Sequence, residues 1–366
     1  EPILVAIVGS QEKELCVLAL KYLQILSLGL PGFMLFENAK HYLQCQGIFH
    51  ASTYVLFFCA PLNAVLNYLL VWDPRIGLGF IGAPLSVVIT DWVMCIMIMV
   101  YIFAIDGWQC WPKEGIFNKK CFTHWQKMLD LSLPGVIMVE AEWLDFEIIT
   151  FTASKFGTEV LAAQSVISTT CVLFYQIPFA FSIAASTRVA WYIGAASHPS
   201  AVVTSNAAIY ASLGIGIVNG LFIFIFRDFL AKLFTSDEKV LDLAGKILII
   251  GAAYQVNDSL SCSTNGILRG QGRQKIGGIL NLLLYYLVAL PLAFLFAFHF
   301  KLELYGLWLG MIIALILVSL SQTYFVYASD WDSIISKSIA DAIEDGGISI
   351  DTHSLRPTVS RGSIIV

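Results

Sequence analysis

The sequence has few charged residues. Only 13% of its 366 residues are Asp, Glu, Lys or Arg, whereas a typical soluble domain carries roughly 25%. Lys plus Arg number 21 against 26 Asp plus Glu, so there is no excess of positive charge to attract nucleic acid. This shortage excludes a water-soluble globule, a disordered chain and a conventional nucleic-acid-binding protein, and a polytopic membrane protein remains.

The sequence also lacks the motifs of metal centres and intramembrane catalysis. Its 8 cysteines form neither a CxxC motif nor a Cys/His ligand spacing, and most lie in apolar runs. We interpret them as small hydrophobic residues with free thiols. The apolar runs contain no Gly-x-Gly-Asp pair, no Ser/His pair at catalytic spacing and no His-rich metal motif. We therefore predict that the protein is no enzyme and uses no metal or organic cofactor.

Long apolar runs are abundant, and 58% of the residues are hydrophobic. A hydrocarbon core about 30 Å thick needs roughly 20 apolar residues per helix. With charged and Gly/Pro-rich pieces marking the breaks, the predicted fold class is all-α, a polytopic membrane protein with about nine transmembrane helices. The predicted spans lie near 16–36, 51–71, 81–105, 131–153, 160–183, 205–226, 244–264, 276–298 and 304–328.

The distribution of Lys and Arg predicts the orientation of these spans. Outside the spans, 12 of them lie on the side that holds the long connection and the polar tail, and 7 lie on the other side. The positive-inside rule then places the connection and the C-terminus in the cytoplasm, and residue 1 on the opposite face. The tail is predicted to be a short helix followed by disorder.

An internal repeat predicts two lobes. A shift of 225 residues aligns 42–47 with 267–272, and it brings Gly82 to within one residue of Gly306. Three further spans precede the second copy, so we expect a duplicated six-plus-six protein of which this chain lacks the first three helices. The expected organisation is a partial N-terminal lobe (1–105), a cytoplasmic inter-lobe loop (106–130), a complete C-terminal lobe (131–328) and a polar tail (329–366). Repeats of this kind place the substrate cavity between two bundles.

The fourth predicted span is unusually acidic, with Glu140, Glu142, Asp145 and Glu147 inside eight residues. At 100° per residue, Glu140 and Glu147 share one face, while Glu142 and Asp145 lie on nearly the opposite face. An ionisable group at the bilayer centre costs at least about 2.5–3.5 kcal/mol. At least one pair must therefore face protein or water.

Asp258 marks a second polar region inside a predicted span, beside Gln255 and Asn257. Carboxyl groups that change protonation inside a cavity are what a proton-coupled carrier requires. The alternative is that these groups hydrogen-bond between helices as packing contacts. Four aromatic residues could likewise hold an organic cation through cation–π contacts, or simply pack: Trp143, Tyr175, Tyr285 and Tyr286.

Several short motifs across about 16–328 together resemble the multidrug and toxic compound extrusion (MATE) transporters, in their eukaryotic and especially fungal form. The motifs are 131–135 (Leu-Ser-Leu-Pro-Gly), 142–147 (Glu-Trp-Leu-Asp-Phe-Glu), 161–165 (Leu-Ala-Ala-Gln-Ser), 177–178 (Ile-Pro) with 184–189 (Ala-Ala-Ser-Thr-Arg-Val), 266–270 (Gly-Ile-Leu-Arg-Gly) and 285–286 (Tyr-Tyr) before Pro291.

The resemblance implies twelve helices in two six-helix lobes around a V-shaped cavity. It also implies proton-coupled antiport that exports organic, often cationic, compounds or xenobiotics. The family's acids fall on Glu142, Glu147 and Asp258, which we predict to couple transport to H+ rather than Na+. We assign substrate binding to Trp143, Gln164, Tyr175, Gln255, Asn281, Tyr285 and Tyr286.

We expect a monomer in the vacuolar or plasma membrane, whose partners are a small organic solute and the lipid bilayer and not nucleic acid. Three departures from the family pattern affect the substrate: Leu144 replaces a second Trp, Asp145 is an additional acid, and Ser168-Thr169 replace a Tyr-Glu pair. Two alternatives stay open. The first is a lipid-linked flippase of the same superfamily, and the second is a non-transporting, truncated fragment.

Overall fold

The computed structural model describes residues 13–75, 77–111 and 125–344. All regular elements in these ranges are helical, so the predicted all-α class is confirmed. Within the described residues, seven helices are long and apolar enough to cross a membrane, and the bent pair Cys16–Leu26 and Leu30–Cys45 makes an eighth if it counts as one span. The 29-residue helix α6 (Trp125–Ala153) corresponds to the remaining predicted span, and its acids set it apart from the others.

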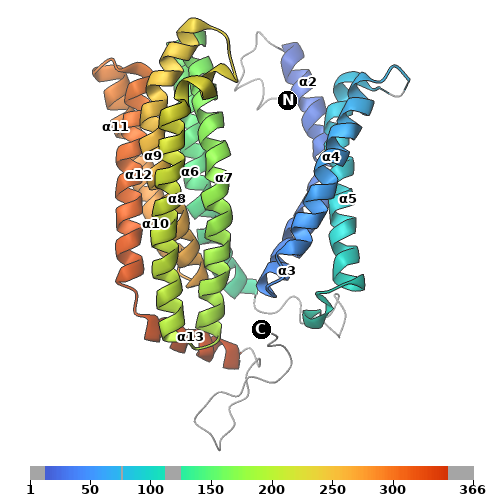
Figure 1. The fold of residues 1–366 in the computed structure, drawn as a ribbon, viewed down its shortest axis with the longest axis vertical. Helices are drawn as coiled ribbons and strands as arrows, with labels where there is room; N and C mark the ends of the chain where they lie inside the picture. Colours follow the sequence, from blue (N-terminus) through green and yellow to red (C-terminus); the bar gives the residue numbers. More distant parts are fainter. Residues whose placement is uncertain (1–12, 76, 112–124, 345–366) are drawn as a thin grey trace, which may run out of the picture. The chain divides into compact units, whose positions relative to one another are not determined.

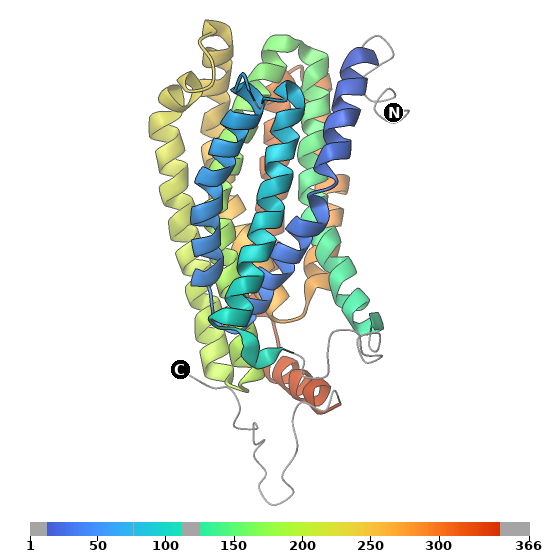
Figure 2. The ribbon, with the colours of Figure 1, turned by 90° about the vertical axis from the view of Figure 1, so that its right-hand side faces the viewer.

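The described residues form two compact units, the first ending at residue 111 and the second beginning at residue 125. In the first unit, α2 (Lys13–Leu26), α3 (Leu30–Cys45), α4 (His50–Trp72) and α5 (Gly82–Ala104) are followed by the short η2 (Trp108–Cys110). Helices α2, α3 and α4 all contact α5 (Figure 2). The core of this unit includes Phe36, Leu43, Val55, Ile98 and Ile102.

The first predicted span, 16–36, is wrong in its shape, because the structure breaks it into α2 and α3 with a bend of 48°. Pro31 lies in the first turn of α3, where its missing N–H is tolerated and where it cannot continue α2. The indole Nε1 of Trp92 donates to the Leu28 carbonyl at 3.0 Å and supplies a partner within the break. Periodicity alone did not show this break, since both halves are equally apolar.

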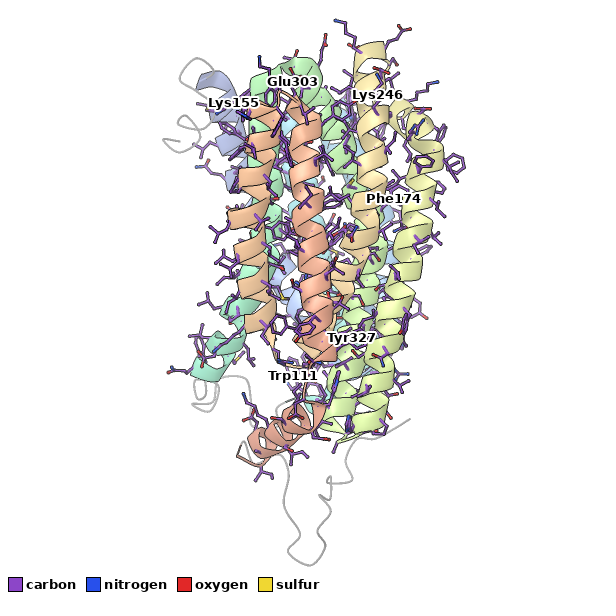
Figure 3. All side chains as sticks on the ribbon, turned by 90° about the vertical axis from the view of Figure 1, so that its left-hand side faces the viewer. Trp111, Lys155, Phe174, Lys246, Glu303 and Tyr327 are labelled. Atoms are coloured by element: carbon purple, nitrogen blue, oxygen red, sulfur yellow. The ribbon has the colours of Figure 1, made fainter. Side chains whose placement is uncertain are left out.

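The second unit contains α6, α7 (Thr158–Gly194), α8 (His198–Lys232), α9 (Glu238–Gly270), α10 (Gln274–Leu284), α11 (Leu290–Phe294), α12 (Glu303–Tyr327) and α13 (Trp331–Glu344). Two π-helical turns, η5 (Tyr285–Ala289) and η6 (Leu295–His299), flank α11. Helix α12 runs from Glu303 to Tyr327, and Lys155 and Lys246 lie at its Glu303 end (Figure 3). Helix α13 lies across the opposite end of the bundle (Figure 1).

Helix α9 is the central helix of the second unit, in contact with α7, α8, α10 and α12. Small residues let α8 approach it closely, since a β-carbon added to Gly220 would lie 2.7 Å from the Ala252 carbonyl oxygen. Hydroxyl groups join the helices: Ser259 donates to the Ser212 carbonyl at 2.7 Å, and Ser182 donates to the Cys262 carbonyl at 2.6 Å. These contacts are the small-residue packing and hydrogen bonding typical of helices in lipid.

The turns that end α3 and α9 have the same geometry. Gly47 and Gly272 both adopt positive φ, of 83° and 70°. In each turn a backbone amide donates to the carbonyl of the leucine five residues earlier. Ile48 donates to Leu43 at 3.0 Å, and Arg273 donates to Leu268 at 2.8 Å. This is a Schellman-type ending, and the two copies are related by the 225-residue shift found in the sequence.

Two glycines occupy corresponding places at the third helix of each copy. A β-carbon on Gly82 would overlap the Leu70 carbonyl oxygen of α4, and one on Gly306 would overlap the Ala297 backbone nitrogen of η6. Helix α5 therefore starts in backbone contact with α4, and helix α12 starts in backbone contact with η6. The two copies of the repeat thus share a close contact between helices as well as a sequence motif.

Some predictions for the inter-lobe loop, the tail and the cysteines concern residues outside the described ranges. Helix α6 begins at Trp125 rather than near 131, and residues 112–124 of the expected loop lie outside the described residues. Helix α13 is the predicted short helix of the tail, whereas residues 345–366, expected to be disordered, also lie outside. The seven described cysteines are free, as predicted, and Cys121 falls outside.

Gly306→Ala should destabilise the second unit by about 1–3 kcal/mol, because the added methyl group meets backbone that cannot move aside. Gly214→Ala on α8 is the matched control, since nothing in the described chain lies within 4 Å of its added β-carbon. Thermal unfolding of the purified protein in detergent would compare the two variants. Equal unfolding temperatures would contradict the close approach at Gly306.

Candidate functional site

A cavity of about 130 Å³ lies within the second unit, between α6, α7 and α9. Its wall combines carboxyl groups, hydroxyl groups and aromatic rings. The lining residues are Glu142, Trp143, Phe146, Glu147, Thr150, Ser168, Cys171, Val172, Tyr175, Tyr254 and Asp258.

Two carboxyl groups meet across this cavity. Glu142 comes from α6 and Asp258 from α9, and their side chains are within hydrogen-bonding reach of each other. Asp258 is 3% exposed, and Glu142 is half-buried. A hydrogen bond between two carboxyl groups requires that one of them carry a proton. The pair is therefore a place where a proton can be held between two helices.

Phenolic hydroxyl groups surround the acid pair. The side chains of Tyr254 and Tyr285 lie beside Glu142, and within the described chain neither hydroxyl has a hydrogen-bond partner. Tyr175 accepts a weak hydrogen bond from the Cys262 Sγ at 3.7 Å. Tyr254 lies one helical turn before Asp258, a spacing that puts both on one face of α9. That spacing could have identified Tyr254, which our sequence analysis missed.

The helical-wheel prediction for α6 agrees with the burial of its acids. Glu140 and Glu147 are exposed, whereas Glu142 is half-buried and Asp145 is fully buried. Glu147 nevertheless lines the cavity together with Trp143, one turn earlier on α6. The structure thus brings together all three acids predicted to couple transport, and leaves Asp145 outside the cavity lining.

Gln164 lies behind the cavity rather than in its wall. Its buried amide donates to the Thr150 hydroxyl at 3.2 Å and the Ser168 hydroxyl at 2.9 Å, and it accepts from the Trp308 indole at 2.8 Å. Two of these partners line the cavity. Gln164 therefore positions lining residues, a role that depends on Trp308, 144 residues away in the sequence.

Asn281 belongs to a second buried network outside the cavity. It donates to the Met138 carbonyl and accepts from Gln322, both at 2.7 Å. Gln322 also donates to Asn265 at 2.8 Å and accepts from Thr264 at 2.7 Å. The network joins α6, α9, α10 and α12, so Asn281 holds the helices that surround the site.

The remaining predicted substrate-binding residues differ in position. Tyr285 is fully buried beside Glu142 but is absent from the cavity lining, and Tyr286 is half-buried and is also absent from it. Gln255 is fully buried, with no partner for either amide atom in the described chain. Of the residues predicted to bind substrate, Trp143 and Tyr175 therefore line the cavity.

Gln322→Leu should destabilise the second unit, because Thr264, Asn265 and Asn281 would each lose a buried partner. Each unpaired group costs about 1–3 kcal/mol. Gln126→Leu, at the exposed start of α6, is the control and should have little effect. Chemical or thermal unfolding in detergent would measure the difference, and two variants of equal stability would show that the network contributes nothing.

Membrane-length apolar helices define an integral membrane protein, and its second unit holds a polar cavity with two facing acids. The MatE family model matches residues 2–69 and 134–295. The chain belongs to the MatE family. This confirms the resemblance seen in the sequence, and members of the family are transporters rather than enzymes.

Curated relatives include fungal and animal proteins. The chain is 41% identical over 354 residues to the uncharacterized transporter YDR338C of Saccharomyces cerevisiae, covering 96% of this chain and 50% of that protein. It is 28% identical over 322 residues to multidrug and toxin extrusion protein 1 of Homo sapiens, covering 88% of this chain and 56% of that protein. The chain thus spans about half the length of the curated relatives it matches.

The fold is also similar to solved MATE structures. The crystal structure of the eukaryotic MATE transporter AtDTX14 superimposes with a TM-score of 0.82 at 24% identity, covering 88% of this chain and 71% of that one. At this identity the likeness concerns the fold alone. It supports the polytopic helical architecture described above.

Proposed function

We propose that the protein to which this chain belongs is a proton-coupled antiporter that exports organic, often cationic, compounds. The observation that carries the proposal is the contact between Glu142 and Asp258 in the cavity. The names of its animal relatives, multidrug and toxin extrusion proteins, support export of drugs and toxins. We further propose a vacuolar or plasma membrane location, with the C-terminus in the cytoplasm.

The cavity can bind a cation and a proton at the same place. Ionised Glu142, Glu147 and Asp258 attract positive charge, and Trp143 and Tyr175 offer aromatic faces for cation–π contacts. Protonation removes the negative charge and weakens the hold on a cationic solute. Competition between proton and solute for the same carboxyl groups would couple their movements in opposite directions, provided that the site faces the two sides of the membrane in turn.

The coupling ion in this proposal is H+ rather than Na+. Two carboxyl groups in hydrogen-bond contact hold one proton without any further ligand, whereas Na+ needs several additional oxygen ligands around it. The lining beside the pair offers aromatic faces from Trp143, Phe146 and Tyr175, and it also carries oxygen atoms on Glu147, Thr150 and Ser168. The preference for H+ therefore rests on the closeness of the two acids, and the aromatic faces suit an organic solute.

Asp258→Asn and Glu142→Gln should each abolish solute uptake driven by a pH gradient in proteoliposomes of the whole protein, because a neutral amide can neither release a proton nor attract a cation. Glu140→Gln is the matched control, as Glu140 lies on the same helix, is exposed and does not line the cavity. Proton-driven uptake that persists in both cavity variants would refute the assignment of these acids.

Trp143→Ala should weaken binding of an organic cation about 2- to 30-fold, which corresponds to the roughly 0.5–2 kcal/mol of one cation–π contact. Leu144→Ala, the neighbouring residue outside the cavity lining, should leave the affinity unchanged. Tetraethylammonium binding to the purified protein can be followed by calorimetry. Equal affinities of the two variants would exclude Trp143 from the binding site.

A further inference from the structure

Aromatic side chains gather at the end of α5 in the first unit. Trp108 and Trp111 of η2 stack with their ring centroids 5.7 Å apart, and Phe103 of α5 contacts these rings at 5.1 and 4.9 Å. Trp111 also meets Tyr42 of α3 edge to face at 6.0 Å. Phe103 and Trp108 are each at least half exposed. Phe103, Trp108 and Trp111 thus form a partly uncovered group, the α5 aromatic cluster.

Hydrogen-bonding groups lie around the apolar rings of this cluster. The Tyr42 hydroxyl donates to the Gly107 carbonyl at 2.8 Å, and the Gln46 amide donates to the same carbonyl at 3.4 Å. Gly107 has a φ of 112°, which lets the chain turn from α5 into η2. At the start of α4, His50 Nε2 and the Tyr101 hydroxyl are 2.9 Å apart. Rings with a polar edge are favoured at the boundary between hydrocarbon and water.

The exposed face of α5 that leads to the cluster is apolar. Ile96, Val100 and Phe103 follow each other at spacings of four and three residues, so they lie on one side of the helix, and each is at least half exposed. No Asp, Glu, Lys or Arg follows Asp91 within α5. The next acidic or basic residue is Asp106, directly before the turn into η2. The aromatic cluster therefore stands where an apolar exposed face gives way to charge.

The second unit has the same pattern at the end of α12. The shift of 224 positions that aligns Gly82 with Gly306 places the exposed face of α5 on three residues of α12: Leu320, Tyr324 and Tyr327. These three residues are also at least half exposed. Both copies of the repeat thus leave the same face of the corresponding helix uncovered, and both faces end in aromatic rings. A feature shared by the two copies points to a common environment.

The length of α4 fits a lipid bilayer as that environment. Tyr54 near its start and Trp72 at its end are both exposed, and the helix contains no Asp, Glu, Lys or Arg. From Tyr54 to Trp72 the helix rises about 27 Å, close to the roughly 30 Å of a hydrocarbon core. Charge begins again directly after Trp72, with Asp73 and Arg75. Aromatic side chains therefore stand at both ends of a charge-free helix of membrane length.

We propose that the α5 aromatic cluster is a bilayer-interface anchor, with Tyr324 and Tyr327 as its counterpart on α12. The partner is the layer of phospholipid glycerol and carbonyl groups. Trp and Tyr rings lie at this level because their apolar bodies contact the acyl chains while their N–H and O–H groups reach water and lipid oxygens. The cluster holds the end of α5 at the membrane surface. This role is independent of the proposed proton coupling.

Electron paramagnetic resonance of a nitroxide on Cys110 measures the depth of η2 in the whole protein reconstituted in phosphatidylcholine. Cys110 is exposed between the two tryptophans, Cys45 and Cys121 are replaced by Ser, and the other cysteines are buried. Collision rates with O2, which concentrates in hydrocarbon, and with a water-soluble nickel complex should place Cys110 at headgroup level. A label on Ile96→Cys, on the exposed face of α5, should lie deeper.

Trp108→Ser removes an exposed ring of the cluster, so collisions of the Cys110 label with the nickel complex should increase several-fold. Gln109→Ser is the matched control, because Gln109 is an exposed neighbour in η2 without a ring, and it should leave the depth unchanged. A label on Ala328→Cys, next to Tyr327 and exposed, should report the same headgroup depth in the second unit.

Three results would overturn the proposal. A Cys110 label that meets the nickel complex as freely as the unattached label does would place the cluster in water. A label shielded from both O2 and nickel would show that protein covers the cluster, either another segment of this chain or a second copy. An unchanged depth in folded Trp108→Ser would show that the ring anchors nothing. The first two results need no variant of the cluster, so they decide the question even if Trp108→Ser fails to fold.

Discussion

The structure of the second unit depends on the need of every polar group in a membrane to find a partner inside the protein. Central helix α9 meets this need with hydroxyl and amide groups that bond to α7, α8 and α12. The Gln164 and Gln322 networks do the same on either side of the acids. Some buried groups have no partner in the described chain, among them the Gln255 amide on α9 and the oxygens of Asp145, Tyr254 and Tyr285. Hydrogen bonds between helices therefore join α9 to its neighbours, while several buried polar groups close to the cavity stay without a partner.

Much of this arrangement could be predicted from the sequence because membrane helices follow two simple rules. Length and hydropathy located the spans, and the 100° rotation per residue separated Glu142 and Asp145 from Glu140 and Glu147 on α6. The repeat aligned Gly47 with Gly272, and the structure gives both glycines a positive φ in matching turns. These features are local, so the sequence carries them directly.

The remaining features depend on partners that are distant in the sequence. Gln164 was predicted to bind substrate, but the indole of Trp308 and two hydroxyl groups occupy its amide. The Asn281 amide is likewise already bonded, because it donates to the Met138 carbonyl and accepts from Gln322. In the break between α2 and α3, the Leu28 carbonyl finds its partner in the indole of Trp92, 64 residues away in the sequence. The periodicity of apolar residues in a sequence does not reveal hydrogen bonds between residues that are far apart in it.

Helix α13 also has a consequence for how the second unit can move. Trp331 and Ile335 complete an apolar cluster with residues of α7, α8, α9 and α12, including Val189, Ile209 and Val326. The ends of these four helices cannot spread apart there without exposing the cluster to water. Helices α6 and α10 contribute no residue to it. The unit is thus held together at one end around four helices, which include α9 with Asp258, whereas α6 with Glu142 and Glu147 lies outside this cluster.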